Sequence, residues 1–205
     1  MLFATSAGFL TGSSLIIVIG AQNFFVLRQG LQRSHVGLVV GVCALSDIAL
    51  ILCGIAGAGI LLREWPQLLE TLRFGAAAFL GSYGLLAAQR AWRAGGAVAP
   101  EPSHKKPDRR RVLLACLGFT FLNPQVYLDT IVLIGGLSTH YPGMARWAFA
   151  LGACAASALW FPALGFGARL LQPVFRSAVA WRVLDGGIAV FMLALCTLLL
   201  LRPLS

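Results

Sequence analysis

Six apolar segments, each long enough to cross a lipid bilayer, follow one another along the chain. They cover about residues 3–26, 37–61, 74–91, 112–137, 146–170 and 184–201. A membrane-spanning helix needs roughly 20 consecutive apolar residues, so the pattern predicts an all-α polytopic membrane protein with six transmembrane helices. Gly8, Gly12 and Gly20 interrupt the first segment. If this segment does not cross fully, the protein has five spans.

Composition supports a membrane protein. The 205 residues are 59% hydrophobic and only 11% charged, whereas a soluble domain carries roughly 25% charged residues. In such a chain a net charge of +9 indicates basic loops at the cytoplasmic face and not nucleic-acid binding. The five cysteines lie in apolar segments without a CxxC pair, and the three histidines lie in loops. We therefore expect the lipid bilayer as a partner, and no metal, cofactor or nucleic acid.

One polar stretch divides the chain into halves. Residues 92–111, WRAGGAVAPEPSHKKPDRRR, combine three prolines with a cluster of bases, which is typical of a linker. It separates residues 1–91 from residues 112–205, and each half has three predicted spans. Because three is odd, the second half enters the membrane in the opposite orientation. The pattern predicts two inverted three-helix repeats, an arrangement that places a transporter's substrate site at the repeat interface.

The distribution of basic residues predicts the orientation. Twelve of the 16 lysines and arginines lie in the loops after spans one, three and five, and four lie on the opposite side. Cytoplasmic loops carry the excess of basic residues, so residues 92–111 are expected in the cytoplasm and both termini outside. With five spans, the N-terminus would be inside.

Three of the seven acidic residues fall within predicted spans: Asp47, Asp129 and Asp185. A carboxylate near the bilayer centre costs roughly 2.5–3.5 kcal/mol on insertion scales, which favours a functional role for the deeply placed Asp47 and Asp129. Asp185 lies at the start of span six, its expected cytoplasmic end, close to Arg182. It is interpreted either as one partner of an interfacial ion pair or as a coupling residue.

Amides and a proline predict breaks in spans one and four. Pro124 cannot donate a backbone hydrogen bond, so span four should break near Phe121–Asn123. The echo between GAQN in span one and FLNP in span four predicts an equivalent break beside Gly20. Backbone groups freed by such breaks are tolerated where they line a cavity, and they suit a zwitterion; alternatively, the amides only bond neighbouring helices. The candidate substrate-binding or coupling residues are Gln22, Asn23, Ser46, Asp47, Asn123, Pro124, Gln125, Tyr127 and Asp129.

Two glycine- and proline-containing stretches have structural interpretations. Pro162, in AASALWFPALGFG, predicts a kink in span five that serves either packing or a hinge. GIAGAG at residues 54–59 indicates glycine-mediated helix packing and not a nucleotide-binding loop, because no strand precedes it.

Four motifs carry a resemblance to a known family. They read GAQNFFVLRQGLQR, VCALSDIALILCGIAG, FLNPQVYLDTIVLIGG and AASALWFPALGFGA. In this order, and over nearly the whole chain, the sequence resembles the lysine/arginine exporter family of bacterial inner-membrane transporters. Related exporters of homoserine and branched-chain amino acids usually read PGPN where this chain reads GAQN, so the resemblance points to the branch for basic amino acids.

The resemblance implies export of L-arginine or L-lysine from the cytoplasm, coupled to the membrane gradient. The family's intramembrane acids correspond to Asp47 and Asp129, its paired asparagines to Asn23 and Asn123, and its span-five proline to Pro162. Two positions depart from the pattern. Gln125 stands where close relatives often have histidine, and Asp185 stands where asparagine is common. These departures put coupling and substrate choice in question.

The expected mechanism is alternating access between the two halves, with Asp47 and Asp129 binding the cationic substrate. Alternatively, because burial favours the neutral form of a carboxyl group, both acids carry protons in exchange, or one acid binds the substrate and the other carries the proton. The alternatives are an exporter of neutral amino acids, an exporter of a metal cation, and a membrane thiol–disulfide carrier. The last would need a cysteine pair across the halves, expected in spans one and four, but span one has no cysteine. Arginine versus lysine, and monomer versus homodimer, stay open.

Overall fold

The computed structural model describes residues 1–17, 20–58, 66–93 and 108–201. Within this part of the chain every regular element is a helix and none is a strand, so the predicted all-α fold is confirmed. The first half contains α1 (Leu2–Ile16), α2 (Ala21–Leu31), α3 (Val36–Cys53), the π-helix η1 (Gly54–Ala58) and α5 (Pro66–Arg93).

The second half is broken into more pieces. It contains α6 (Arg109–Phe121), α7 (Pro124–Tyr127), the π-helix η2 (Leu128–Ile134), α8 (Gly135–Ser138), α9 (Met144–Gly167), the 3₁₀ helices η3 (Ala168–Leu171) and η4 (Val174–Arg176), and α10 (Ala178–Leu201). Most of the predicted linker, residues 94–107, lies outside the described residues. Its two ends continue α5 as far as Arg93 and begin α6 at Arg109.

Three helical segments are long and apolar enough to cross a membrane: Val36–Gly57, Met144–Leu171 and Ala178–Leu201. Two bent helix pairs raise the number to five if each pair is one span. The remaining predicted span, residues 74–91, falls in α5, which is 28 residues long but is not among the described helices that meet this test. The structure therefore gives three to five candidate spans, and six remains a prediction.

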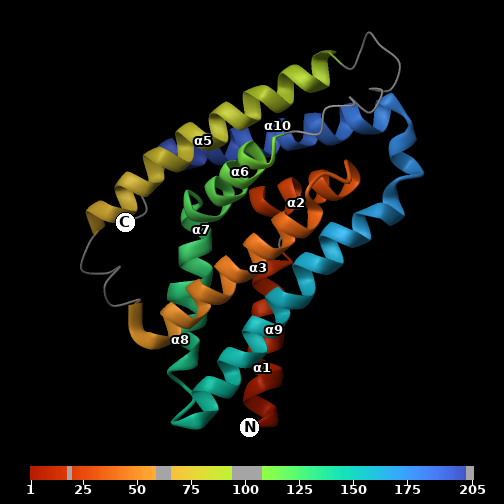
Figure 1. The fold of residues 1–205 in the computed structure, drawn as a ribbon. Coiled ribbons are helices and arrows are strands. Elements are labelled where there is room, and N and C mark those ends of the chain that lie inside the picture. The colour runs from red at the N-terminus through yellow and green to blue at the C-terminus, as the bar shows by residue number, and fades with distance from the viewer. Residues whose placement is uncertain (18–19, 59–65, 94–107, 202–205) are drawn as a thin grey trace.

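Two helix pairs form the frame of the molecule. α5 packs along α10, and α1 packs along α9, while α3 crosses between them and contacts both α9 and α6 (Figure 1). Glycines bring α1 and α9 into backbone contact, since a Cβ atom on Gly8 would lie 2.0 Å from the carbonyl oxygen of Phe149. A Cβ on Gly152 would lie equally close, 2.0 Å, to the oxygen of Thr5. Small residues at this interface are what allows the close approach.

Both predicted breaks are present. α6 ends at Phe121 and α7 begins at Pro124, and the chain bends by 57° there. The break predicted near Phe121–Asn123 is therefore confirmed, and its cause is the missing backbone donor and the ring of Pro124. α1 and α2 meet at 80°, with Gly20 as the extended residue before α2.

Glycines bring the π-helix that follows α3 into backbone contact with η2 and with the start of α8. A Cβ on Gly54 would lie 2.7 Å from the Cα of Ile131 in η2, and one on Gly135 would lie 2.6 Å from the oxygen of Gly54. The helix-packing interpretation of residues 54–59 is therefore confirmed for Gly54. It is wrong for Gly57, where an added Cβ would have no described atom within 4 Å and the residue instead adopts a positive φ of 111°; Gly59 lies outside the described residues.

Candidate functional site

A cavity of about 380 Å³ opens where the two broken helices meet. Its wall draws on both halves of the chain, and apolar side chains of α1, α5, α9 and α10 complete it. Six of the polar residues predicted from the sequence lie on this wall: Gln22, Asn23, Asp47, Asn123, Gln125 and Asp129. The structure thus brings together residues that are up to about 100 positions apart in the sequence.

The two acids of the cavity have few partners. Asp47 is 4% exposed; its Oδ2 accepts a hydrogen bond from Ser157 Oγ at 3.4 Å, and its Oδ1 has no hydrogen-bond partner among the described residues. Asp129 is half-buried, and its Oδ1 accepts a hydrogen bond from Gln125 Nε2 at 2.8 Å. Neither acid forms an ion pair within the described part of the chain. Two carboxyl groups without a protein cation make the cavity suited to a cationic ligand.

At the first break, Asn23 holds the two helix ends together. Its Nδ2 donates a hydrogen bond to the carbonyl oxygen of Ile16, the last residue of α1, at 2.7 Å. Its Oδ1 accepts a hydrogen bond from Trp160 Nε1 on α9 at 3.3 Å. Asn23 therefore satisfies a carbonyl that the end of α1 leaves without an intrahelical donor, and it ties the break to α9.

At the second break, two side chains share the equivalent task. Asn123 Oδ1 accepts a hydrogen bond from the backbone N–H of Gln125 at 3.1 Å and so caps α7. The hydroxyl of Tyr127 donates to the carbonyl oxygen of Phe121, the last residue of α6, at 2.8 Å. Asn23 and Asn123 occupy matching positions in their motifs but differ in what they bond: Asn23 donates to the preceding helix, and Asn123 caps the following one.

Three other predicted residues lie next to the cavity and not on its wall. Ser46 precedes Asp47 on α3, and Pro124 is the first residue of α7. Pro162 lies inside α9, which continues from Met144 to Gly167, and follows Phe161, a wall residue. The hinge role of Pro162 remains a prediction.

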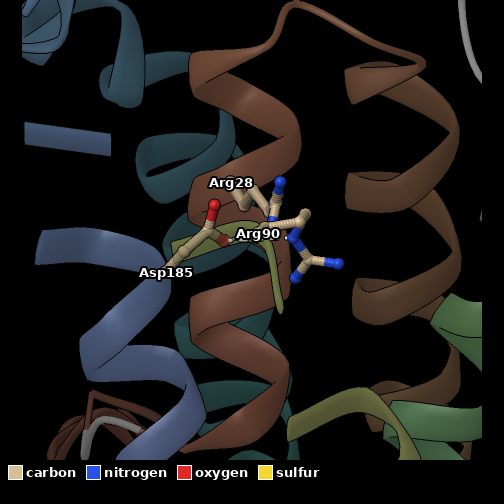
Figure 2. Close-up of polar contacts among 3 residues, drawn as sticks. All are labelled: Arg28, Arg90 and Asp185. Carbon is tan, nitrogen blue, oxygen red and sulfur yellow. Dashed lines mark hydrogen bonds and ion pairs between the residues drawn. The ribbon is translucent and has the colours of Figure 1, made fainter. Parts of the chain in front are cut away.

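Asp185 belongs to a second polar cluster, outside the cavity wall. It forms ion pairs with Arg28 of α2 and with Arg90 of α5, whose Nε lies 3.3 Å from Asp185 Oδ1 (Figure 2). The predicted ion pair is therefore present, but the prediction of Arg182 as its partner is wrong: among the described residues, Asp185 pairs with Arg28 and Arg90. Arg182 is exposed on α10, whereas Asp185 is buried and faces α2 and α5. We call Arg28, Asp185 and Arg90 the charge cluster.

Aromatic rings separate the charge cluster from the cavity. Along α2, Gln22 and Asn23 on the cavity wall are followed by Phe25 and then by Arg28. The ring of Phe25 packs against Phe119 and Tyr83, with centroid distances of 4.9 and 6.3 Å, and Arg90 lies over the Tyr83 ring at 5.4 Å. The aromatic layer consists of Phe25, Phe79, Tyr83 and Phe119.

The structure also shows a cysteine pair that sequence reasoning missed. Cys43 of α3 and Cys116 of α6 are buried free thiols whose Sγ atoms lie 3.4 Å apart. A thiol–disulfide carrier is expected to have such a pair in spans one and four, whereas α3 corresponds to span two. The sequence signal was available, since spans two and four each have a cysteine near their start, but nothing local in the sequence pairs them.

Comparison with known proteins gives a consistent family. The family model for LysE type translocators matches residues 13–202. Proteins of Mycobacterium bovis and of two strains of Mycobacterium tuberculosis, each named "Putative amino-acid transporter", are 47% identical over 193 residues, which cover 94% of this chain and 94% of each relative. No solved structure matches the chain. The match over nearly the whole length establishes that this protein belongs to the LysE type translocator family.

Proposed function

We propose that this protein is a secondary transporter that exports basic amino acids, L-arginine or L-lysine, from the cytoplasm across the inner membrane. The observation that carries the proposal is the pair Asp47 and Asp129, which face one cavity and have no ion-pair partner among the described residues. The names of the mycobacterial relatives support amino acids as the substrate class.

The charges of a basic amino acid match those of the cavity. Arginine has a guanidinium group that stays protonated, together with an α-ammonium and an α-carboxylate. Its two cationic groups can be balanced by Asp47 and Asp129, and its carboxylate by amide N–H donors at the helix breaks. A volume of about 380 Å³ also falls within the usual range for small-molecule pockets, roughly 300–1,000 Å³.

Corresponding contacts support two inverted repeats. If α1 and α2 correspond to α6–α8, α3 to α9 and α5 to α10, then the contact of α1 with α9 has its counterpart in the contact of α6 with α3. The contact of α5 with α10 joins the two equivalent third helices. Alternating access by relative movement of such halves around a fixed site is a common transporter plan.

The charge cluster and the aromatic layer are proposed to close the cytoplasmic side. Arg28 and Arg90 lie at the ends of helices that the charge distribution orients toward the cytoplasm. On α10, Asp185 precedes the wall residue Phe191 by six residues, which is about 9 Å along a helix. Opening of the cavity toward the cytoplasm would then require α2, α5 and α10 to separate at these ion pairs. In the same proposal, Asp47 or Asp129 carries the coupling proton.

Efflux from proteoliposomes tests the proposal. Vesicles preloaded with labelled arginine, lysine or leucine are followed under an imposed proton gradient and after an ionophore has collapsed it. We expect arginine or lysine to leave faster than leucine, and only with the gradient. Leucine efflux that is equal or faster would reject the basic specificity. Efflux of a divalent metal ion from such vesicles, without efflux of any of the three amino acids, would reject the amino-acid assignment.

A further inference from the structure

Two buried polar atoms on the cavity wall lack partners, and they are of opposite kinds. Gln22 is 7% exposed and Asp47 is 4% exposed. The donor Nε2 of Gln22 and the acceptor Oδ1 of Asp47 have no hydrogen-bond partner among the described residues. A buried donor or acceptor without a partner is costly. A ligand that supplies both an acceptor and a donor would remove both costs.

Gln22 also lies in the first turn of a helix whose N-terminus is open. α2 begins at Ala21 after Gly20, and no side chain among the described residues caps it. The first N–H groups of a helix have no intrahelical acceptor, and together with the helix dipole they favour an anionic group. α7 differs, because Asn123 accepts from the N–H of Gln125 at 3.1 Å and so occupies that end.

The position of Gln22 relative to Asp47 suits an amino acid. The side chain of Gln22 lies beside the Cys43 thiol, which is a weak acceptor at best. Cys43 and Asp47 are four residues apart on α3, so they share one helix face about one turn, or about 5–6 Å, apart. Gln22 and Asp47 line the same cavity, so the amide donor and the carboxylate can together hold the carboxylate and the ammonium that an amino acid has on one carbon.

We propose that the open N-terminus of α2 and the Gln22 amide form the subsite for the substrate's α-carboxylate, with the α-ammonium on Asp47. Gln22 is then the residue by which the transporter distinguishes an amino acid from the corresponding amine. The inference rests on the proposed function only in taking this cavity as the substrate site. It does not depend on whether the amino acid is basic or neutral.

Matched ligands with and without a carboxylate test the assignment. L-arginine is compared with agmatine, and L-leucine with 3-methylbutylamine, and the binding of each ligand to the purified full chain is measured directly. Gln22→Met keeps the side-chain length and removes the amide. The variant should lower the affinity for the amino acid by about 10- to 100-fold, as expected for the loss of a hydrogen bond to a charged group. The affinity for the amine should stay within about twofold of the wild type, since a ligand without a carboxylate makes no such bond. Retained amine binding also shows that the variant is folded.

A charge variant and a control from the second break complete the design. Gln22→Glu should lower the affinity for arginine further and raise the affinity for agmatine. The new carboxylate repels the carboxylate of arginine and attracts the cationic groups of agmatine. Gln125→Met should change the affinities for arginine and agmatine by the same factor, since the amide of Gln125 bonds Asp129 and not the expected position of the carboxylate.

The results separate this inference from the proposed function. If Gln22→Met leaves the affinity for arginine unchanged, or lowers the affinities for arginine and agmatine equally, the proposed carboxylate subsite is wrong, while the proposal of basic amino-acid transport stands. If the wild-type protein binds leucine and not arginine, the basic specificity is wrong, and the leucine pair decides the subsite. If the wild-type protein binds none of these amino acids, both proposals fail.

Discussion

The buried acids of the cavity and of the charge cluster differ in whether a basic side chain of the protein pairs with them. Asp185 is held between Arg28 and Arg90, which come from two different helices (Figure 2). Asp47 is as deeply buried, yet its described contact is a single hydroxyl at 3.4 Å. A buried charge normally needs a partner, and in the proposed function the substrate supplies the cation that the cavity lacks.

The two regions also differ in the backbone that carries them. The charge cluster lies within the unbroken parts of α2, α5 and α10, whereas α2 reaches the cavity with its first turn, at the break. The cavity lies at two helix breaks, and Asp129 lies in the π-helix η2, a geometry found frequently at functional sites. Regular helices fix an ion pair, whereas broken ones present free backbone donors and acceptors to a ligand. Substitutions of the acids in each region, compared for their effects on transport and on stability, therefore test this difference.

The largest expected effect is on transport through the cavity. In Asp47→Asn, efflux of labelled arginine should fall about 30-fold or more, because removing one partner of a buried charge pair costs roughly 2–5 kcal/mol. The measurement is the initial efflux rate per inserted transporter. Asp108→Asn is the matched control, since Asp108 is an exposed acid that caps α6. Efflux of Asp47→Asn within twofold of the wild type would reject a counter-charge role.

The next effect is on stability at the charge cluster. Asp185→Asn leaves two arginines without their acid, and breaking a buried ion pair this way costs roughly 3–5 kcal/mol. The thermal midpoint of the detergent-solubilised protein should fall clearly. Adding Arg28→Gln should recover part of the loss, because Arg28 is the more buried of the two arginines. A single variant as stable as the wild type, or a double variant less stable than the single, would contradict this account.

A smaller effect is expected at the thiol pair, which lies one turn from Asp47 on α3. Oxidation of Cys43 and Cys116 to a disulfide by a membrane-permeant oxidant would fix α3 to α6, the helices whose thiols approach to 3.4 Å. Arginine efflux should fall severalfold and recover after dithiothreitol, because alternating access needs the two halves to move. Cys43→Ser, which keeps the other cysteines, should be insensitive. Equal inhibition of Cys43→Ser would mean that the oxidant acts elsewhere.

The smallest effect concerns the hydroxyl that bonds Asp47. Ser157→Ala removes a bond of 3.4 Å, which is long for an O–H donor. The apparent affinity for arginine should change by less than about tenfold, the range of an ordinary hydrogen bond. A loss as large as that of Asp47→Asn would show that Ser157, and not an external cation, satisfies the acid.

Local chemistry made part of this architecture predictable from the sequence. Pro124 locates the second break because its effect on the helix is confined to one turn. Asp47 and Asp129 stand out because a carboxylate at depth is costly, and both lie on the cavity wall. The partner of Asp185 was not predictable in this way, since Arg28 is 157 residues away. The approach of Cys43 to Cys116 likewise depends on how α3 packs against α6, and no local pattern announces the π-helix around Asp129.

Direct binding of labelled L-arginine to four purified proteins tests the central claim: the wild type, Asp47→Asn, Asp129→Asn and Asp185→Asn. If the cavity acids bind the substrate cation while Asp185 serves the closed conformation, the first two variants lose binding and Asp185→Asn keeps it at a temperature where it is folded. Wild-type affinity in both Asp47→Asn and Asp129→Asn, with loss in Asp185→Asn, would contradict the account and place the substrate at the charge cluster.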